Sequence, residues 1–191
     1  MALPPPGRTL RVIGFDDVPW RHRQSGTVGL VGAVCAGTRF EGMVYGSVRR
    51  DGWRATLTIE RLLLESKFLP QLHLVLLDGI AFGGFNLLDL PRLAQTLRRP
   101  CVSVMRKLPD IAAMERAARR LPRPEARIAI LRRAGPIHVS GPFVYQVQGA
   151  DPGEIAVALR RLTDTGHVPE ALRLAHLIGG AFAHGESGRR A

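Results

Sequence analysis

Cysteine is scarce in this chain, and long hydrophobic runs are missing. The 191 residues include two cysteines, Cys35 and Cys101, without a CxxC motif or a Cys/His ligand spacing. This pattern argues against a disulfide framework and against a zinc site, so we expect two reduced, buried thiols. The longest weakly polar run, Gly26 to Gly37, is too short and too rich in glycine to cross a bilayer. We therefore predict that the protein has no membrane partner.

The N-terminus lacks the charged and apolar regions of a signal peptide, since it reads MALPPPGR. We expect a cytoplasmic protein in which residues 1–8 form a flexible segment and residues 9–188 form a single domain. Familiar catalytic motifs are missing as well. The chain has no GxxxxGK[ST] phosphate loop, no GxGxxG fingerprint and no nucleophile elbow. The chemistry that these motifs serve therefore finds no support.

Acidic residues are the minority charge. The chain has 16 Asp and Glu against 27 Lys and Arg, which gives a formal net charge of +11, and nearly all the cations are arginine. The planar guanidinium binds phosphate oxygens through two parallel hydrogen bonds, so we predict a nucleic-acid partner. The arginine-rich codon usage of a GC-rich genome is the alternative explanation. The basic stretch from Arg116 to Arg133 is either a set of phosphate contacts or a solvated helix face.

Glycine-bordered apolar runs and stretches of helical spacing together predict an α/β fold. Predicted strands cover residues 9–16, 26–37, 39–50, 71–78, 100–107 and 142–149, the last as an edge strand. Predicted helices cover residues 53–68, 86–99 (starting at Asn86 or Asp89), 109–121 and 151–166, with a last helix after Pro169. Residues 122–141 receive no assignment. An antiparallel meander followed by parallel strands predicts one mixed sheet with helices on both faces.

Two of the predicted strands end in an acid, the first at Asp16 and the fourth at Asp78. Ligands of open α/β sheets gather beyond the carboxyl ends of the strands, so the two carboxylates can reach one cation if the strands are neighbours. Because side chains alternate along a strand, only one of Asp16 and Asp17 can join Asp78, and the other has a supporting role. A carboxylate pair suits Mg²⁺. The alternative is that each acid is an ordinary turn or cap residue.

The segment GHVPEALRLAHLI near the C-terminus adds three polar candidates. Glu170, Arg173 and His176 lie three residues apart and share one face of the predicted helix. His176 either belongs to the site or is a half-buried histidine whose hydrogen bonds are satisfied within the fold.

Five motifs occur in a recognisable order: GFDDVPW, RDGWRATLTIERLL, LVLLDGIAFGGFNLLDL, VSVMRKLPD and VPEALRLAHLIGGAFAHGES. Over residues 9–188 this order resembles the endonuclease dU family, which is similar to endonuclease V and therefore to proteins of the ribonuclease H-like fold. The resemblance implies a Mg²⁺-dependent nuclease, with Mn²⁺ as an alternative ion. It also implies action on nucleic acid with deaminated bases, uracil in particular, and DNA is favoured over RNA.

The resemblance assigns roles to individual residues. Mapped by motif, Asp16 matches the first-strand aspartate of endonuclease V, Asp78 matches the aspartate of its Asp-Gly turn, and Lys107 matches the lysine after the next strand. His176 lies where endonuclease V has an acid, so it is expected as a fourth catalytic residue. Arg173 on the same helix is expected to contact the substrate.

The loop that follows Asp78 contains Gly83, Gly84, Phe85 and Asn86. These four residues are expected to bind the substrate by forming a surface that the damaged base can approach closely. The alternative is that they form a structural turn.

One position departs from the family pattern Asp-Gly-x-Asp-Ala-Thr. Residues 51–56 read DGWRAT, so Arg54 stands where the second aspartate is expected. Asp51 is then the expected third metal ligand and catalytic acid, with Glu60 as a weaker candidate, and Arg54 is expected to bind a phosphate. If no carboxylate reaches the site, the chain is a catalytically weakened or inactive nucleic-acid-binding protein. A third reading is a structural protein whose acids are caps, and the oligomeric state stays open.

Overall fold

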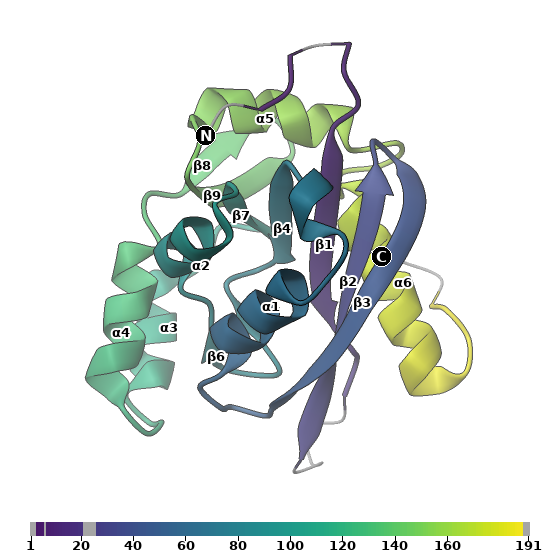
Figure 1. Cartoon of the computed structure of the whole chain (residues 1–191). Helices are drawn as coiled ribbons and strands as arrows, with labels where there is room; N and C mark the ends of the chain where they lie inside the picture. Colours follow the sequence, from purple (N-terminus) through teal and green to yellow (C-terminus); the bar gives the residue numbers. More distant parts are fainter. Residues whose placement is uncertain (1–2, 6, 21–25, 189–191) are drawn as a thin grey trace.

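The computed structural model describes residues 3–5, 7–20 and 26–188 (Figure 1). The predicted flexible segment 1–8 lies partly outside the described residues, and its Leu3 packs against the core. The strands are β1 (Arg11–Asp17), β2 (Thr27–Ala36), β3 (Arg39–Arg49), β4 (Leu74–Asp78), β5 (Ala81–Phe82), β6 (Asn86–Leu87), β7 (Cys101–Met105), β8 (His138–Ser140) and β9 (Phe143–Gln148). The helices are α1 (Ala55–Leu64), the 3₁₀ turn η1 (Leu69–Gln71), α2 (Leu90–Leu97), α3 (Ile111–Ala118), α4 (Pro124–Arg133), α5 (Pro152–Arg161) and α6 (Glu170–His184).

Seven strands form one mixed sheet in the order β3-β2-β1-β4-β7-β9-β8. The first three form the predicted antiparallel meander, and β1, β4 and β7 are parallel to one another. The predicted mixed α/β sheet is therefore confirmed. β9 is not the edge strand that the sequence predicted, because the short strand β8 pairs with its outer side. Residues 143–147 of β9 are all buried, as suits a strand with a neighbour on each side.

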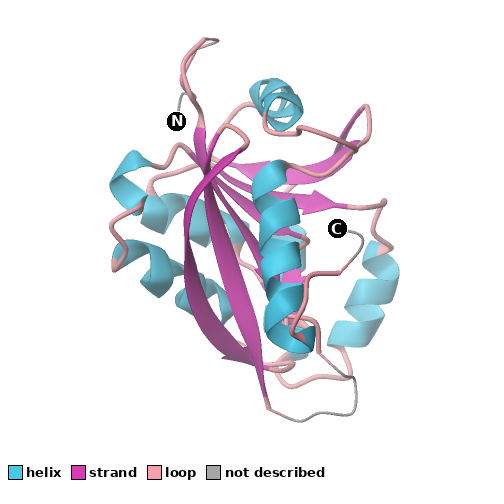
Figure 2. Cartoon of the chain, turned by 90° about the vertical axis from the view of Figure 1, so that its right-hand side faces the viewer, coloured by secondary structure: helices cyan, strands magenta, loops and turns pink. Residues whose placement is uncertain are grey.

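Helices cover both faces of the sheet, and each face has its own hydrophobic core (Figures 1 and 2). Alternation along β1 sends Ile13 and Phe15 into the core beneath α1, α2 and α4. It sends Val12 to the opposite face, where Leu74 and Leu76 of β4 meet α5 and α6. The position of each residue along β1 therefore determines which helices it contacts. Asp16 lies four residues after Val12 and points to the same face of the sheet.

Side-chain caps fix where three of the helices begin. Asp89, Asp110 and Asp151 each accept a hydrogen bond from a backbone N–H three residues later, which satisfies a free donor of the first turn. The helix predicted from residue 86 or 89 therefore starts after Asp89, and Asn86 belongs to the small hairpin of β5 and β6. The helix predicted over 151–166 ends earlier, at Arg161.

The remaining global expectations concern membranes and thiols. None of the helices in the described ranges has the length and apolar character that crossing a bilayer requires. Cys35 and Cys101 are both buried and free of disulfides, as expected.

Candidate metal centre

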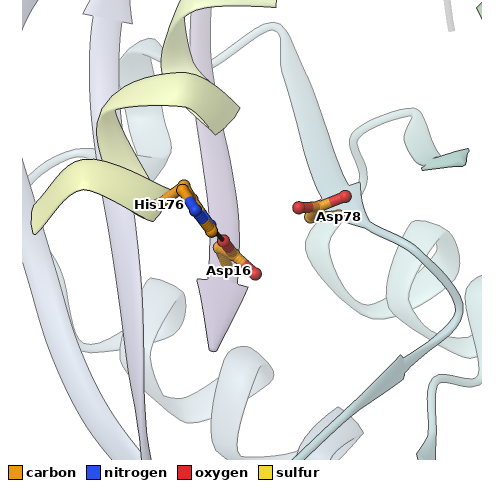
Figure 3. Close-up of side chains that lie close together, drawn as sticks. All are labelled: Asp16, Asp78 and His176. Carbon is orange, nitrogen blue, oxygen red and sulfur yellow. Dashed lines mark hydrogen bonds and ion pairs between the residues drawn. The ribbon is translucent and has the colours of Figure 1, made fainter. Parts of the chain in front are cut away.

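The carboxyl ends of β1 and β4 lie side by side, because the two strands pair in parallel with Phe15 opposite Leu77. Asp16 is the second-last residue of β1 and Asp78 ends β4, so their side chains lie near each other at the same edge of the sheet (Figure 3). Together with His176 of α6 they form a cluster in which one ligand atom of each residue lies within 4.8 Å of the others. We call these three residues the acid cluster. The ends of β1 and β4 are therefore neighbours, as the sequence predicted.

A close approach of α6 to β1 brings His176 to the cluster. A Cβ atom at Gly14 would lie 2.6 Å from the backbone carbon of Ala171 and 2.6 Å from the backbone nitrogen of Leu172, so only glycine allows this contact. His176 then lies beside Asp16, with its Nδ1 2.8 Å from Oδ2 of the carboxylate. This hydrogen bond, aided by the charge of Asp16, raises the pKa of His176 above its usual value.

Asp17 points to the other side of the strand, as the alternation predicted. Its Oδ2 accepts a hydrogen bond of 2.6 Å from the backbone N–H of Gly83, and its own N–H donates to Oδ1 of Asp16 at 2.8 Å. Burial raises the pKa of Asp17 to about 6, and the charges of Asp16 and Asp78 add to this increase. Asp17 therefore ties the loop after β4 to the end of β1.

The charges at the cluster are only partly compensated. Burial, followed by the nearby charge of Asp16, raises the pKa of Asp78. The guanidinium of Arg106 contacts the Asp78 carboxylate at 3.4 Å, but its side chain is 61% exposed. Carboxylates that are buried together are destabilised unless a cation joins them. Two carboxylates with an adjacent imidazole are a donor set that fits a divalent ion, so the residues present suit the metal that the family resemblance implies.

Asp51 does not join the acid cluster, contrary to its expected role as the third carboxylate ligand. Its Oδ1 accepts a hydrogen bond of 2.9 Å from the N–H of Phe85, and its Oδ2 forms an ion pair of 3.3 Å with Arg50. The residue has a φ of +50°, and this left-handed turn directs the carboxylate to the loop at residues 83–85. The carboxylate is thus used to hold backbone.

Glu60, the weaker candidate, is also occupied elsewhere. Its side chain is 7% exposed and binds the Arg92 guanidinium through two hydrogen bonds of 2.8 and 3.0 Å. This pair joins α1 to α2 beneath the sheet. Neither candidate for the missing third carboxylate is therefore brought to the cluster.

The loop at residues 83–86 is held from several directions. Gly83 and Gly84 have positive φ values of 54° and 86°, which favour glycine. Asn86, fully buried, donates to the backbone oxygens of Arg49 and Gly83. The guanidinium of Arg127 binds the carbonyl oxygen of Phe85. The structure thus gives these residues a well-fixed turn that lies next to Asp17.

Three basic residues predicted for the site lie in different surroundings. Lys107 is exposed, two residues beyond the end of β7, and its neighbour Arg106 makes the contact with Asp78. Arg173 forms two hydrogen bonds, of 2.8 and 2.5 Å, with Glu170 on its own helix. Arg54 is the exposed N-cap residue of α1 and has no contact with the acid cluster among the described residues. Sequence reasoning missed Arg106, because a basic pair after a strand does not show which member faces the carboxylate.

The basic stretch from Arg116 to Arg133 is partly used within the fold. Arg127 is 3% exposed and donates to backbone oxygens, among them those of Asp51 at 2.9 Å and Gly52 at 3.0 Å. Arg132 pairs with Glu115, and Arg133 pairs with Asp89. These three arginines stabilise helix contacts, so they are not available as free phosphate contacts.

Comparison with known proteins places the chain among a defined set of relatives. The model of the family "Endonuclease dU" matches residues 8–183. A UPF0215 protein of Methanothermobacter thermautotrophicus is 37% identical over 183 residues, which cover 93% of this chain and 90% of the relative. The crystal structure of a protein of unknown function from Archaeoglobus fulgidus superposes with a TM-score of 0.87 at 34% identity, over 92% of this chain and 99% of that chain.

A more distant likeness concerns the fold. Endonuclease V of Ciona intestinalis, solved in complex with a 24mer DNA that contains an inosine followed by a ribo-adenosine, superposes with a TM-score of 0.56 at 15% identity. The match covers 89% of this chain and 84% of that chain. The predicted similarity to endonuclease V, and hence the ribonuclease H-like fold, is confirmed.

Proposed function

This chain belongs to the endonuclease dU family, and we propose that it is a metal-dependent endonuclease that cleaves the backbone of nucleic acid containing a deaminated base, with uracil as the favoured base. The observation that carries the proposal is the acid cluster of Asp16, Asp78 and His176 at the edge where two parallel strands end. Ligand sites of open α/β sheets lie at this edge.

Asp16 and Asp78 would hold the divalent ion, for which Mg²⁺ is the first candidate and Mn²⁺ the alternative. Mg²⁺ in proteins takes one or two carboxylates together with phosphate oxygens and water. When bound, such an ion lowers the pKa of a water molecule and offsets the charge that develops on the phosphoryl oxygens. The imidazole of His176 favours Mn²⁺ if it also becomes a ligand.

The other residues at the cluster would position the Asp16 carboxylate and the glycine turn, and would neutralise the charge of the phosphate. His176 orients the Asp16 carboxylate through its Nδ1 and can carry a proton there, since its pKa is raised by that hydrogen bond. Arg106 lies beside Asp78 and Lys107 follows it on the exposed side, so both can approach the phosphate of a bound strand. Asp17 holds Gly83 in place, which keeps the glycine turn beside the cluster as the surface for the damaged base.

DNA is the proposed substrate. Support comes from the endonuclease V of Ciona intestinalis, whose structure contains DNA with an inosine, and from the net charge of +11 of this chain. Inosine carries a deaminated base, which agrees with a preference for deaminated bases.

The test is a cleavage assay with labelled strands that carry uracil, hypoxanthine or normal bases, with Mg²⁺, with Mn²⁺ or with a chelator. We expect nicking of the uracil strand that requires the ion. The variant Asp78→Asn should lose at least about a hundredfold in rate, because a catalytic metal contributes several kcal/mol and about 1.4 kcal/mol is tenfold. The matched control is Glu154→Gln, an exposed acid on α5, which should cleave at the wild-type rate.

Other outcomes would contradict parts of the proposal. Cleavage in the presence of chelator, or full activity of Asp78→Asn, would refute the role of the acid cluster. Equal cleavage of strands with and without uracil would refute the base preference. Tight binding without any cleavage would favour the inactive nucleic-acid-binding protein instead.

A further inference from the structure

A second concave site lies between α1 and the loop that joins α3 to α4. Its volume is about 790 Å³, within the range of sites that bind small organic ligands. Segments 47–54 and 121–123 form two of its walls, and α1 contributes a third. Six arginines and one acid line it: Arg49, Arg50, Arg54, Arg61, Arg123, Arg127 and Asp51. We call this site the arginine pocket.

Most of the positive charge of the arginine pocket is uncompensated. Its single acid, Asp51, is already bound to Arg50 and to the N–H of Phe85. Arg49, Arg54, Arg61 and Arg123 are exposed, and no acid in the described part of the chain forms an ion pair with any of them. Like charges gathered around one hollow favour an anion.

The N-terminus of α1 adds to this preference. Arg54 is its N-cap residue, no side chain caps the helix, and its first turn contains no acid. The free N–H groups of this turn and the helix dipole both favour a negative group at the pocket. A phosphate is the anion that suits several guanidiniums together with such N–H groups.

The pocket also has a flat apolar wall. The Trp53 ring is partly buried, with the guanidinium carbons of Arg123 and Arg127 at 5.7 and 5.3 Å from its centroid. Leu57 beside it is 44% exposed and extends the apolar surface of the pocket. Phosphate next to a flat apolar group is the chemistry of a nucleotide.

One loop connects the arginine pocket to the acid cluster. The turn at residues 83–85 is bound on one side by Asp17 and on the other by Asp51, through the N–H groups of Gly83 and Phe85. Arg127, which lines the pocket, binds the carbonyl oxygen of the same Phe85. A strand that leaves the cluster across this turn therefore meets the pocket next.

We infer that the arginine pocket binds one nucleotide of a single-stranded segment that leads away from the bond cleaved at the acid cluster. Arg54, Arg61 and Arg123 hold its phosphates, and Trp53 with Leu57 receives its base. The segment is single-stranded, since only an unstacked base can lay its face against protein side chains. The inference rests on the proposed function for the identity of the ligand, but it does not depend on cleavage.

The test measures binding rather than activity. A labelled single-stranded oligonucleotide of normal bases is titrated with the protein in chelator, and its anisotropy is recorded at several salt concentrations. The double variant Arg54→Gln/Arg61→Gln is compared with Arg160→Gln, which removes an exposed arginine from α5, a helix outside the pocket. The loss of two phosphate contacts should weaken binding roughly tenfold at about 0.15 M salt and reduce the salt slope by about 1.4. The control should stay within about twofold of the wild type.

A second variant tests the apolar wall. Trp53→Leu should weaken oligonucleotide binding roughly fivefold or more, as expected from the loss of one stacked base, and a thermal melt verifies that the variant is folded. Weaker oligonucleotide binding in Arg54→Gln/Arg61→Gln and also in Trp53→Leu, with unchanged binding in Arg160→Gln, would support the inference.

Two results would overturn the inference. An equal loss of binding free energy per removed arginine in the double variant and in Arg160→Gln would mean that binding follows overall charge and not the pocket. Displacement of the oligonucleotide by a nucleoside monophosphate at a similar concentration would mean that the pocket binds free nucleotides. Because the titration is carried out in chelator and does not depend on cleavage, failure of the cleavage proposal leaves this result readable: the pocket variants would still lose binding.

Discussion

Replacing Asp17 by asparagine is expected to stabilise the metal-free protein at neutral pH. The carboxylate is partly buried near Asp16 and Asp78, and these surroundings raise its pKa from 3.8 to about 6. The folded chain therefore keeps a proton on Asp17 in a pH range where the unfolded chain has released it. Asparagine cannot ionise, and its side-chain oxygen can still accept the N–H of Gly83.

The sign of the effect follows from proton linkage. Between about pH 4 and pH 6 the folded wild type binds more protons at Asp17 than the unfolded chain does, so this residue's contribution to stability is lost as the pH rises. A shift of about two pKa units corresponds to roughly 3 kcal/mol. Because Asp17 is partly exposed, we discount this to about 1–2 kcal/mol at pH 7.

The assay is urea unfolding followed by circular dichroism, in chelator, from about pH 3.5 to pH 7.5. The difference in free energy of unfolding between Asp17→Asn and wild type should be near zero at the acid end and reach its full value above pH 6. The matched control is Asp164→Asn, an exposed aspartate outside the cluster, which should show no comparable rise. Adding Mg²⁺ should stabilise the wild type more than Asp17→Asn, because the negative charge of the ionised Asp17 lies near Asp16 and Asp78 and attracts an ion that those two acids hold.

A difference in stability that does not change with pH would show that ionisation of Asp17 does not destabilise the folded protein. A loss of stability in Asp17→Asn at pH 7 would also contradict the prediction, because the hydrogen bond to Gly83 would then outweigh the cost of the buried charge.

Two further predictions concern the packing that supports the cluster. Gly14→Ala should destabilise the fold by about 1–3 kcal/mol, because the new methyl group would lie 2.6 Å from the backbone of α6; urea unfolding measures the loss, and an unchanged stability would contradict the close contact. Arg92→Leu should cost about 2 kcal/mol by leaving Glu60 buried without its partner, and adding Glu60→Gln should recover part of this loss in a double-mutant cycle.

The acid pair could be predicted because it depends on two simple features of the chain. Asp16 and Asp78 each end an apolar run, and neighbouring parallel strands bring such ends together. The separation of Asp16 from Asp17 follows equally from the alternation of side chains along a strand. The edge strand β8 could not be predicted, because its three residues are too few for a periodic pattern.

The sequence could not show that Asp51, the expected third carboxylate, lies away from the acid cluster, because a backbone turn sets the direction of its side chain. Asp51 has a left-handed φ of +50°, and this conformation turns its carboxylate toward Phe85. Arg106 and Lys107 present a similar problem on a smaller scale, since the sequence does not show which of two adjacent cations faces Asp78. The arginine pocket was invisible in the sequence because its walls come from segments about seventy residues apart.

The position of Arg54 changes how its substitution is understood. From the sequence, a cation that replaces an expected aspartate indicates a damaged metal site. In the structure, Arg54 lines the arginine pocket and is not part of the acid cluster of Asp16, Asp78 and His176. A cation at Arg54 therefore places no positive charge in contact with the acid cluster, and it adds to the surface that attracts phosphate. The turn that Asp17 and Asp51 hold from its two sides separates the acids that would bind the ion from the arginines that would bind the nucleic acid. A basic nuclease with a small acidic centre requires this separation.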